Sequence, residues 1–181
     1  MGTNKTTVAV GCIFEYYGKI PENVYNTNEK LTLLEKAVYD NDPETIKKLV
    51  MNGRMVDAQL KIGRMSCIEY AAMMGYHKVL QQLFELSING KILETYFRSN
   101  DIVQRSQLLS RNKDVFFDRG GLAEANRWLA ALYTAIEYNQ SECLLVLLDL
   151  LGSREIETAA FRSGSTTEAI RPIELAELRG F

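Results

Sequence analysis

The side chains that most often carry out chemistry are few and dispersed in this chain of 181 residues. His77 is the single histidine, so neither a two-histidine metal site nor a His-Glu-x-x-His helix can form. Three cysteines occur, at Cys12, Cys67 and Cys143. Cys67 heads one predicted helix, and Cys143 falls on the buried side of another, so we interpret Cys143 as a small core residue and neither cysteine as a nucleophile.

Other signatures of enzymes are also missing from the sequence. No Gly-rich phosphate loop of the Walker or dinucleotide kind occurs, and "DRGG", which contains Gly120 and Gly121, indicates a turn in an insertion. The carboxylates are numerous but spread over predicted helix surfaces, so no catalytic pair stands out. We therefore expect no enzyme activity, no metal and no cofactor.

The bulk composition is typical of a globular protein in a reducing compartment. Hydrophobic residues make up 46% of the chain and charged residues 24%. The net charge of −2 gives no electrostatic argument for nucleic acid as a partner. The cysteines are odd in number, no apolar run approaches the roughly 18 residues of a spanning helix, and no secretory signal is present. We expect a cytoplasmic location, in a bacterial or a host cytosol.

The elements that would position a binding site repeat along the chain. Four predicted helices end at residues that enter the left-handed conformation easily: Asn41, Gly75, Asn139 and Gly180. An alanine stands four residues before each of these: Ala37, Ala71, Ala135 and Ala176. A branched aliphatic residue stands seven before: Leu34, Ile68, Leu132 and Ile173. These two positions share one helix face, where alanine lets a neighbouring helix approach closely.

A second apolar helix follows each of the first three ends. Its stripe lies five, eight and nine residues further on: Ile46, Leu49 and Val50; Leu80, Leu83 and Phe84; Leu144, Leu147 and Leu148. The pattern predicts two antiparallel helices joined by a tight turn. We call the residue at each turn, such as Gly75, an elbow. Low proline content favours a mostly helical chain, with "TTVAVGCIF" as a candidate strand near the start.

Four segments of the chain resemble ankyrin repeats: "TLLEKAVYDNDPETIKKLVMNG", "SCIEYAAMMGYHKVLQQLFEL", "AALYTAIEYNQSECLLVLLDLLG" and "RPIELAELRGF". The resemblance implies an all-α fold, an α-solenoid of stacked helix-turn-helix ankyrin-like repeats, with an irregular N-terminal segment. The family's Thr-Pro-Leu-His histidine is replaced by Glu35, Glu69, Tyr133 and Glu174. Its hydrogen bonds between repeats are therefore in doubt, and the glutamates either replace them or face water.

The predicted organisation is an N-terminal extension, residues 1–30, followed by an array over 31–181. Its repeats are about 31–64, 65–88, an irregular 91–127, 128–152 and a partial 171–181. In the irregular repeat Tyr96 replaces the alanine and Asn100 would be the elbow. Because the last repeat stops at Phe181, we expect the chain to be part of a longer protein, with a short final cap as the alternative.

The resemblance also implies where a partner would bind. In ankyrin-like arrays the concave face is lined by loop tips and by the two residues before each elbow: Tyr39, Asp40, Met73, Met74, Glu137, Tyr138, Leu178 and Arg179. The loop "GRMVDAQLKIGRM" adds a basic tip, with Arg54, Lys61 and Arg64. Tyr, Met and Arg are enriched at protein interfaces. Two alternatives remain open: some of these residues pack inside the protein, and the loop is simply solvated.

The sequence therefore predicts a protein–protein interaction module, a monomer that binds a partner protein as scaffolds or secreted bacterial effectors do. One alternative is a targeting or regulatory arm of a larger enzyme or channel whose functional domain lies beyond residue 181. Another is a myristoylated membrane adaptor, because "MGTNKT" fits the N-myristoylation pattern with Gly2 as acceptor. A membrane is a partner only if Gly2 is acylated, and a chance match is the simpler interpretation.

Overall fold

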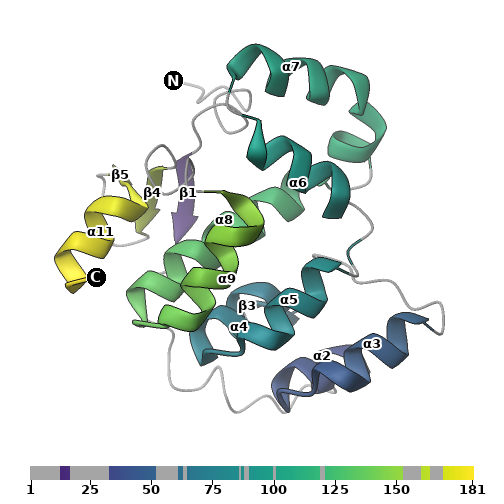
Figure 1. Cartoon of the computed structure of the whole chain (residues 1–181), viewed down its shortest axis with the longest axis vertical. Coiled ribbons are helices and arrows are strands. Elements are labelled where there is room, and N and C mark those ends of the chain that lie inside the picture. Colours follow the sequence, from purple (N-terminus) through teal and green to yellow (C-terminus); the bar gives the residue numbers. More distant parts are fainter. Residues whose placement is uncertain are drawn as a thin grey trace.

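The computed structural model describes residues 13–16, 33–51, 61–62, 65–85, 87, 90–99, 101–118, 121–152, 160–163 and 169–181. These residues are mostly helical, with a few short strands, so the expected all-α class is confirmed (Figure 1). No helix in the described part of the chain has both the length and the apolar character to cross a membrane.

The predicted helix ends are found where the sequence places them. Helices α2 (Leu33–Tyr39), α4 (Cys67–Met74), α8 (Gly121–Glu137) and α11 (Pro172–Arg179) each lead into an elbow. The elbow φ angles are +55° at Asn41, +78° at Gly75, +56° at Asn139 and +80° at Gly180. At each elbow the next residue donates its N–H to the carbonyl of the alanine five residues earlier, as Tyr76 does to Ala71 at 2.8 Å. This is the Schellman closure of a helix, made four times at the same offset.

The first three elbows are followed by a second helix: α3 (Pro43–Met51), α5 (His77–Glu85) and α9 (Ser141–Leu151). Helices α2, α4, α8 and α11 lie side by side in that order, and α3, α5 and α9 pack on one another in a second row (Figure 1). We call these two rows the stack. Ala37, Ala71, Ala135 and Ala176 are all buried. The small side chains therefore stand where neighbouring helices meet, as their spacing predicts.

The segment expected to form the irregular repeat is a helix hairpin that lies outside these rows. It consists of α6 (Gly90–Arg98) and α7 (Ile102–Arg111), followed by the π-helical segment η2 (Asp114–Asp118). Because α4 packs directly on α8 and α5 directly on α9, nothing stands between the second and fourth predicted repeats. We call residues 90–118 the side hairpin; it contacts α9 through α6 and α8 through η2. Since α8 begins at Gly121, the expected repeat boundary at 127 falls inside that helix.

Short strands precede two of the first-row helices. Strands β2 (Lys61–Ile62) and β3 (Met65–Ser66) pair antiparallel and lead into α4. Strands β4 (Ala160–Ser163) and β5 (Ala169–Ile170) pair antiparallel before α11. Strand β1 (Ile13–Tyr16) pairs with β4 in parallel; only its first two residues overlap the candidate strand "TTVAVGCIF", whose remainder lies outside the described residues.

Candidate binding surface

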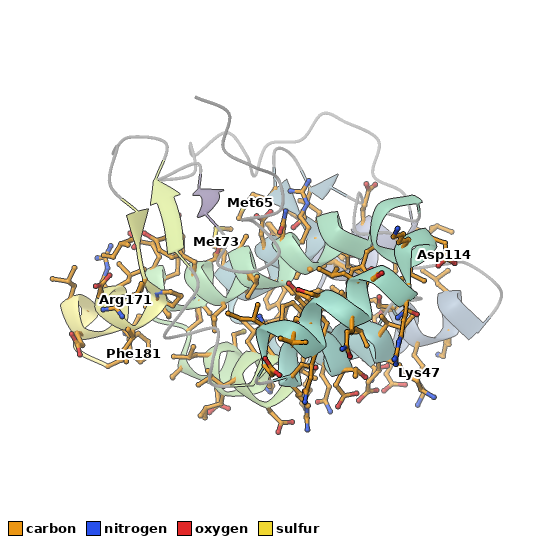
Figure 2. The ribbon with its side chains drawn as sticks, turned by 90° about the horizontal axis from the view of Figure 1, so that it is seen from above. Lys47, Met65, Met73, Asp114, Arg171 and Phe181 are labelled. Carbon is orange, nitrogen blue, oxygen red and sulfur yellow. The ribbon has the colours of Figure 1, made fainter. Side chains whose placement is uncertain are left out.

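The residues before the elbows come together across the first row of helices. We call Tyr39, Asp40, Met74, Glu137, Tyr138, Leu178 and Arg179 the elbow strip. Tyr39, Met74 and Tyr138 are half-buried, whereas Leu178 is 75% exposed. Because the strip belongs to four adjacent helices, its members form a row that runs toward α11. Figure 2 shows α11, marked by Phe181, and the region of Lys47 on α3 at opposite ends of the molecule.

Met73 does not belong to this surface, and its place among the expected partner contacts must be corrected. Its side chain is only 3% exposed, and it is part of the hydrophobic core. Its carbonyl accepts a hydrogen bond from Gln140 Nε2 at 2.7 Å, which ties the end of α4 to the start of α9. The position two before an elbow is partly exposed at Tyr39 and Glu137 but is covered in the middle of the row, at Met73.

Aromatic rings fix one end of the strip. The Tyr39 and Tyr70 rings stack with centroids 5.8 Å apart, and Tyr70 meets Tyr76 edge to face at 6.3 Å. Partial burial raises the pKa of the Tyr76 hydroxyl, and the nearby Tyr39 and Asp40 raise it further. Since Tyr70 is buried, the two outer rings rest on a rigid base.

The charged members of the strip have partners within the chain. Asp40 pairs with Lys36 at 2.7 Å, and Glu137 pairs with Arg179 from the neighbouring helix. Exposed pairs of this kind contribute little to stability, but they fix the pattern of charge that a partner meets. The strip is therefore a partly apolar row whose acidic residues are already compensated.

Glu69 and Glu174 each close the first turn of their own helix. Glu69 Oε2 accepts from the Ser66 N–H at 3.0 Å, while Ser66 Oγ accepts from the Glu69 N–H at 3.1 Å. Glu69 also lies 3.6 Å from Arg127 on α8, so it links two helices of the row. Glu174 accepts from the Arg171 guanidinium and from the Arg171 N–H, each at 2.8 Å, and these two bonds lower the pKa of the Glu174 carboxyl.

Gln140 and the two buried thiols hold the centre of the stack. A Cβ added at Gly75 would lie 2.6 Å from Gln140 Oε1, so this elbow needs glycine for space as well as for φ.

Cys143 Sγ lies 3.9 Å from the Ala71 carbonyl oxygen. Burial raises the pKa of the Cys67 and Cys143 thiols from 9.0 to about 12. Both are core residues, as the sequence predicts for Cys143, and both stay protonated at neutral pH.

A groove lies between the first and second elbows and was not foreseen from the sequence. It encloses about 390 Å³ and is lined by Asn41, Pro43, Gly75, Tyr76, His77 and Lys78. We call it the elbow groove. Its lining comes from two elbows and from residues after them, whereas the partner contacts expected from the sequence stand before the elbows. The His77 side chain in this lining is half-exposed.

The remaining expected contacts cannot be placed. Arg64, Arg54 and the lipidation candidate Gly2 lie outside the described residues, as does the side chain of Lys61. Within the part of the chain that the structure describes, no group of three or more His, Cys, Asp or Glu side chains could hold a metal ion. The sequence matches no family model, and it has no significant match among curated proteins or solved structures.

Proposed function

We propose that this chain is a protein–protein interaction module of the ankyrin-like repeat type, which binds a partner protein across the elbow strip. The observation that carries the proposal is the recurrence of one geometry on four adjacent helices. The same Schellman closure aligns the residues before each elbow, and those at the surface form one row. Antiparallel strands before α4 and α11 support the repeat assignment, because ankyrin repeats carry such fingers in front of their first helix.

The chemistry of the row favours recognition over catalysis. Tyr39, Met74, Tyr138 and Leu178 offer apolar contact area, and the Lys36–Asp40 and Glu137–Arg179 pairs frame it. Aromatic, Met and Arg side chains are the types enriched at protein interfaces. A partner that covers them gains apolar burial and meets charges whose positions are already fixed, which favours specificity.

The experiment is capture of a partner from native lysate on the immobilised chain, followed by binding titrations with the captured protein. Leu178→Asp is the test variant, and Leu145→Asp on α9 is its matched control. These leucines are 75% and 64% exposed and lie in different rows of helices, so each change adds one charge at an exposed site. We expect Leu178→Asp to weaken binding at least tenfold, since a charge would be buried under the partner.

The titrations need a second strip variant, because Leu178 stands at the end of the row. Tyr138→Ser removes a central ring and should also weaken binding at least tenfold. Fluorescence of Trp128, the single tryptophan and fully buried, reports whether each variant is folded. Full-strength binding by both folded strip variants, or equal loss in Leu145→Asp, would refute the proposal.

A further inference from the structure

The lining of the elbow groove includes two basic side chains. His77 and Lys78 line it, and neither forms an ion pair with another described residue. Asp40 and Asp42 flank the first elbow, and each interacts with a residue of its own segment. Asp40 pairs with Lys36, and Asp42 accepts from the Thr45 N–H at 3.0 Å. Hydrogen bonds from Thr45 lower the pKa of Asp42, and the charge on Lys48 lowers it further.

The corresponding space between the second and third elbows is filled by a side chain of the protein. Between the second and third elbows of the row, the Gln140 side chain crosses Gly75 and donates to the Met73 carbonyl. The residue at the corresponding position of the preceding elbow is Tyr76, whose ring turns toward Tyr70 instead. The groove between the first two elbows is therefore open, although the fold fills the next one with a polar side chain.

We infer that the elbow groove binds an acidic side chain of the partner protein, with its carboxylate directed at Lys78 and His77. The methylenes of a glutamate would lie against the Tyr76 ring and Pro43, so the site offers both apolar area and charge. The contacts to Tyr70 hold Tyr76 in place before any partner arrives, which reduces the entropy lost on binding. This inference rests on the proposed function and deepens it by naming the chemistry that the partner presents.

The test uses the full chain labelled with ¹⁵N and three blocked tripeptides: Ac-Gly-Glu-Gly-NH2, Ac-Gly-Gln-Gly-NH2 and Ac-Gly-Lys-Gly-NH2. Amide shifts are followed during titration. We expect the glutamate peptide alone to shift the amides of residues 75–79, with weak affinity and with weakening in added salt. Lys78→Gln should reduce this affinity at least threefold. Lys91→Gln, at an exposed lysine on α6, is the matched control and should change nothing.

Several outcomes would overturn the inference. These are equal shifts with all three peptides, strongest binding of the lysine peptide, shifts centred on residues 139–141, or an unchanged titration in Lys78→Gln. The captured partner separates this inference from the proposed function. If Lys78→Glu binds that partner normally while Leu178→Asp does not, the elbow groove is irrelevant and the elbow strip stands. If the glutamate peptide binds at the groove while both strip variants capture normally, the proposed function fails alone.

Discussion

The helices of the stack and those of the side hairpin end and pack in different ways. In α4 the inward residues Ala71 and Ala72 are completely buried, and the helix ends at the left-handed Gly75. In α6 the residue at the corresponding place is Tyr96, which is also buried but packs on Phe97 and Phe116 with ring centroids 5.5 Å away in each case. Small residues thus admit a neighbouring helix, whereas large rings form a local core.

The side hairpin contains a buried arginine that binds carbonyls of the same hairpin. Arg105 on α7 is only 4% exposed, donates to the carbonyls of Phe97 at 2.9 Å and Ser99 at 3.0 Å, and lies 4.9 Å from the Tyr96 ring centroid. These hydrogen bonds satisfy carbonyls at the end of α6. In the stack, the corresponding carbonyls at a helix end accept from the backbone N–H that follows an elbow. The end of α6 is therefore satisfied by a side chain of the side hairpin itself, without an elbow and without a neighbouring helix of the row.

The largest effect is expected from filling the contact between α4 and α8. Ala71→Phe would force a ring into the core of the stack, since Ala71 is fully buried. We expect a loss of about 3 kcal/mol or more in the free energy of unfolding, measured with urea and Trp128 fluorescence. Thr95→Phe, at an exposed position beside Tyr96, should change it by less than about 0.5 kcal/mol. Equal losses would show that the two regions tolerate bulk alike.

The second prediction compares two costs of replacing an elbow glycine: the strain of the left-handed backbone and the steric clash of an added Cβ. Gly75 and Gly180 have φ angles of +78° and +80°, but only Gly75 has a side chain within 4 Å of an added Cβ. Gly180→Ala should lose about 1 kcal/mol from the left-handed backbone, and Gly75→Ala about 2 kcal/mol because Gln140 must also move. Urea unfolding measures both.

The double variant Gly75→Ala with Gln140→Ala identifies the source of the difference. Removing the Gln140 side chain relieves the contact but also removes the 2.7 Å hydrogen bond to the Met73 carbonyl. The two changes should therefore be less than additive. Strictly additive losses, or identical losses at Gly75 and Gly180, would contradict the role assigned to Gln140.

The third effect tests the closure of the side hairpin. Arg105→Met keeps much of the side-chain volume but removes two hydrogen bonds to carbonyls and the contact with the Tyr96 ring. We expect a loss of about 2 kcal/mol in the free energy of unfolding. Arg111→Met, at the exposed end of α7, is the control and should lose less than about 0.5 kcal/mol. A neutral Arg105→Met would mean that the rings alone hold this hairpin together.

Local rules explain what the sequence predicted well. The elbows at Asn41, Gly75, Asn139 and Gly180 follow from the few residue types that adopt a left-handed conformation. The burial of Ala71 and Ala135 follows from helical spacing and small size. Both depend on fewer than ten consecutive residues, so a single sequence contains the information.

Contacts between distant segments explain what the sequence did not predict. Met73 and Met74 are chemically identical, and only the position of α8 and Gln140 decides that Met73 is covered. Tyr76 packs on Tyr70 and lines the elbow groove, whereas Gln140, at the matching position after the next elbow, crosses Gly75. Tyr96 did signal an irregular repeat, but spacing alone did not reveal that α4 would pack directly on α8.

The smallest effect at neutral pH concerns the two thiols of the stack. Burial raises the pKa of Cys67 and Cys143 to about 12, so the native state keeps both neutral. This contribution to stability is complete below about pH 9 and is lost as the pH rises toward 12, because the unfolded chain then releases protons that the native thiols retain. Urea unfolding at pH 7 and pH 10 should show a smaller fall in Cys67→Ala/Cys143→Ala than in the unchanged chain.

Labelling of these thiols extends the comparison to local opening. In a Cys12→Ser background, a disulfide reagent at pH 8 should modify Cys67 and Cys143 at least a hundredfold more slowly in the native protein than in urea. Ala71→Phe loosens the contact that covers them and should accelerate labelling strongly. Arg105→Met should accelerate it little if the side hairpin opens independently of the stack. Equal acceleration in the two variants would mean that both regions unfold as one cooperative unit, despite their different modes of closure.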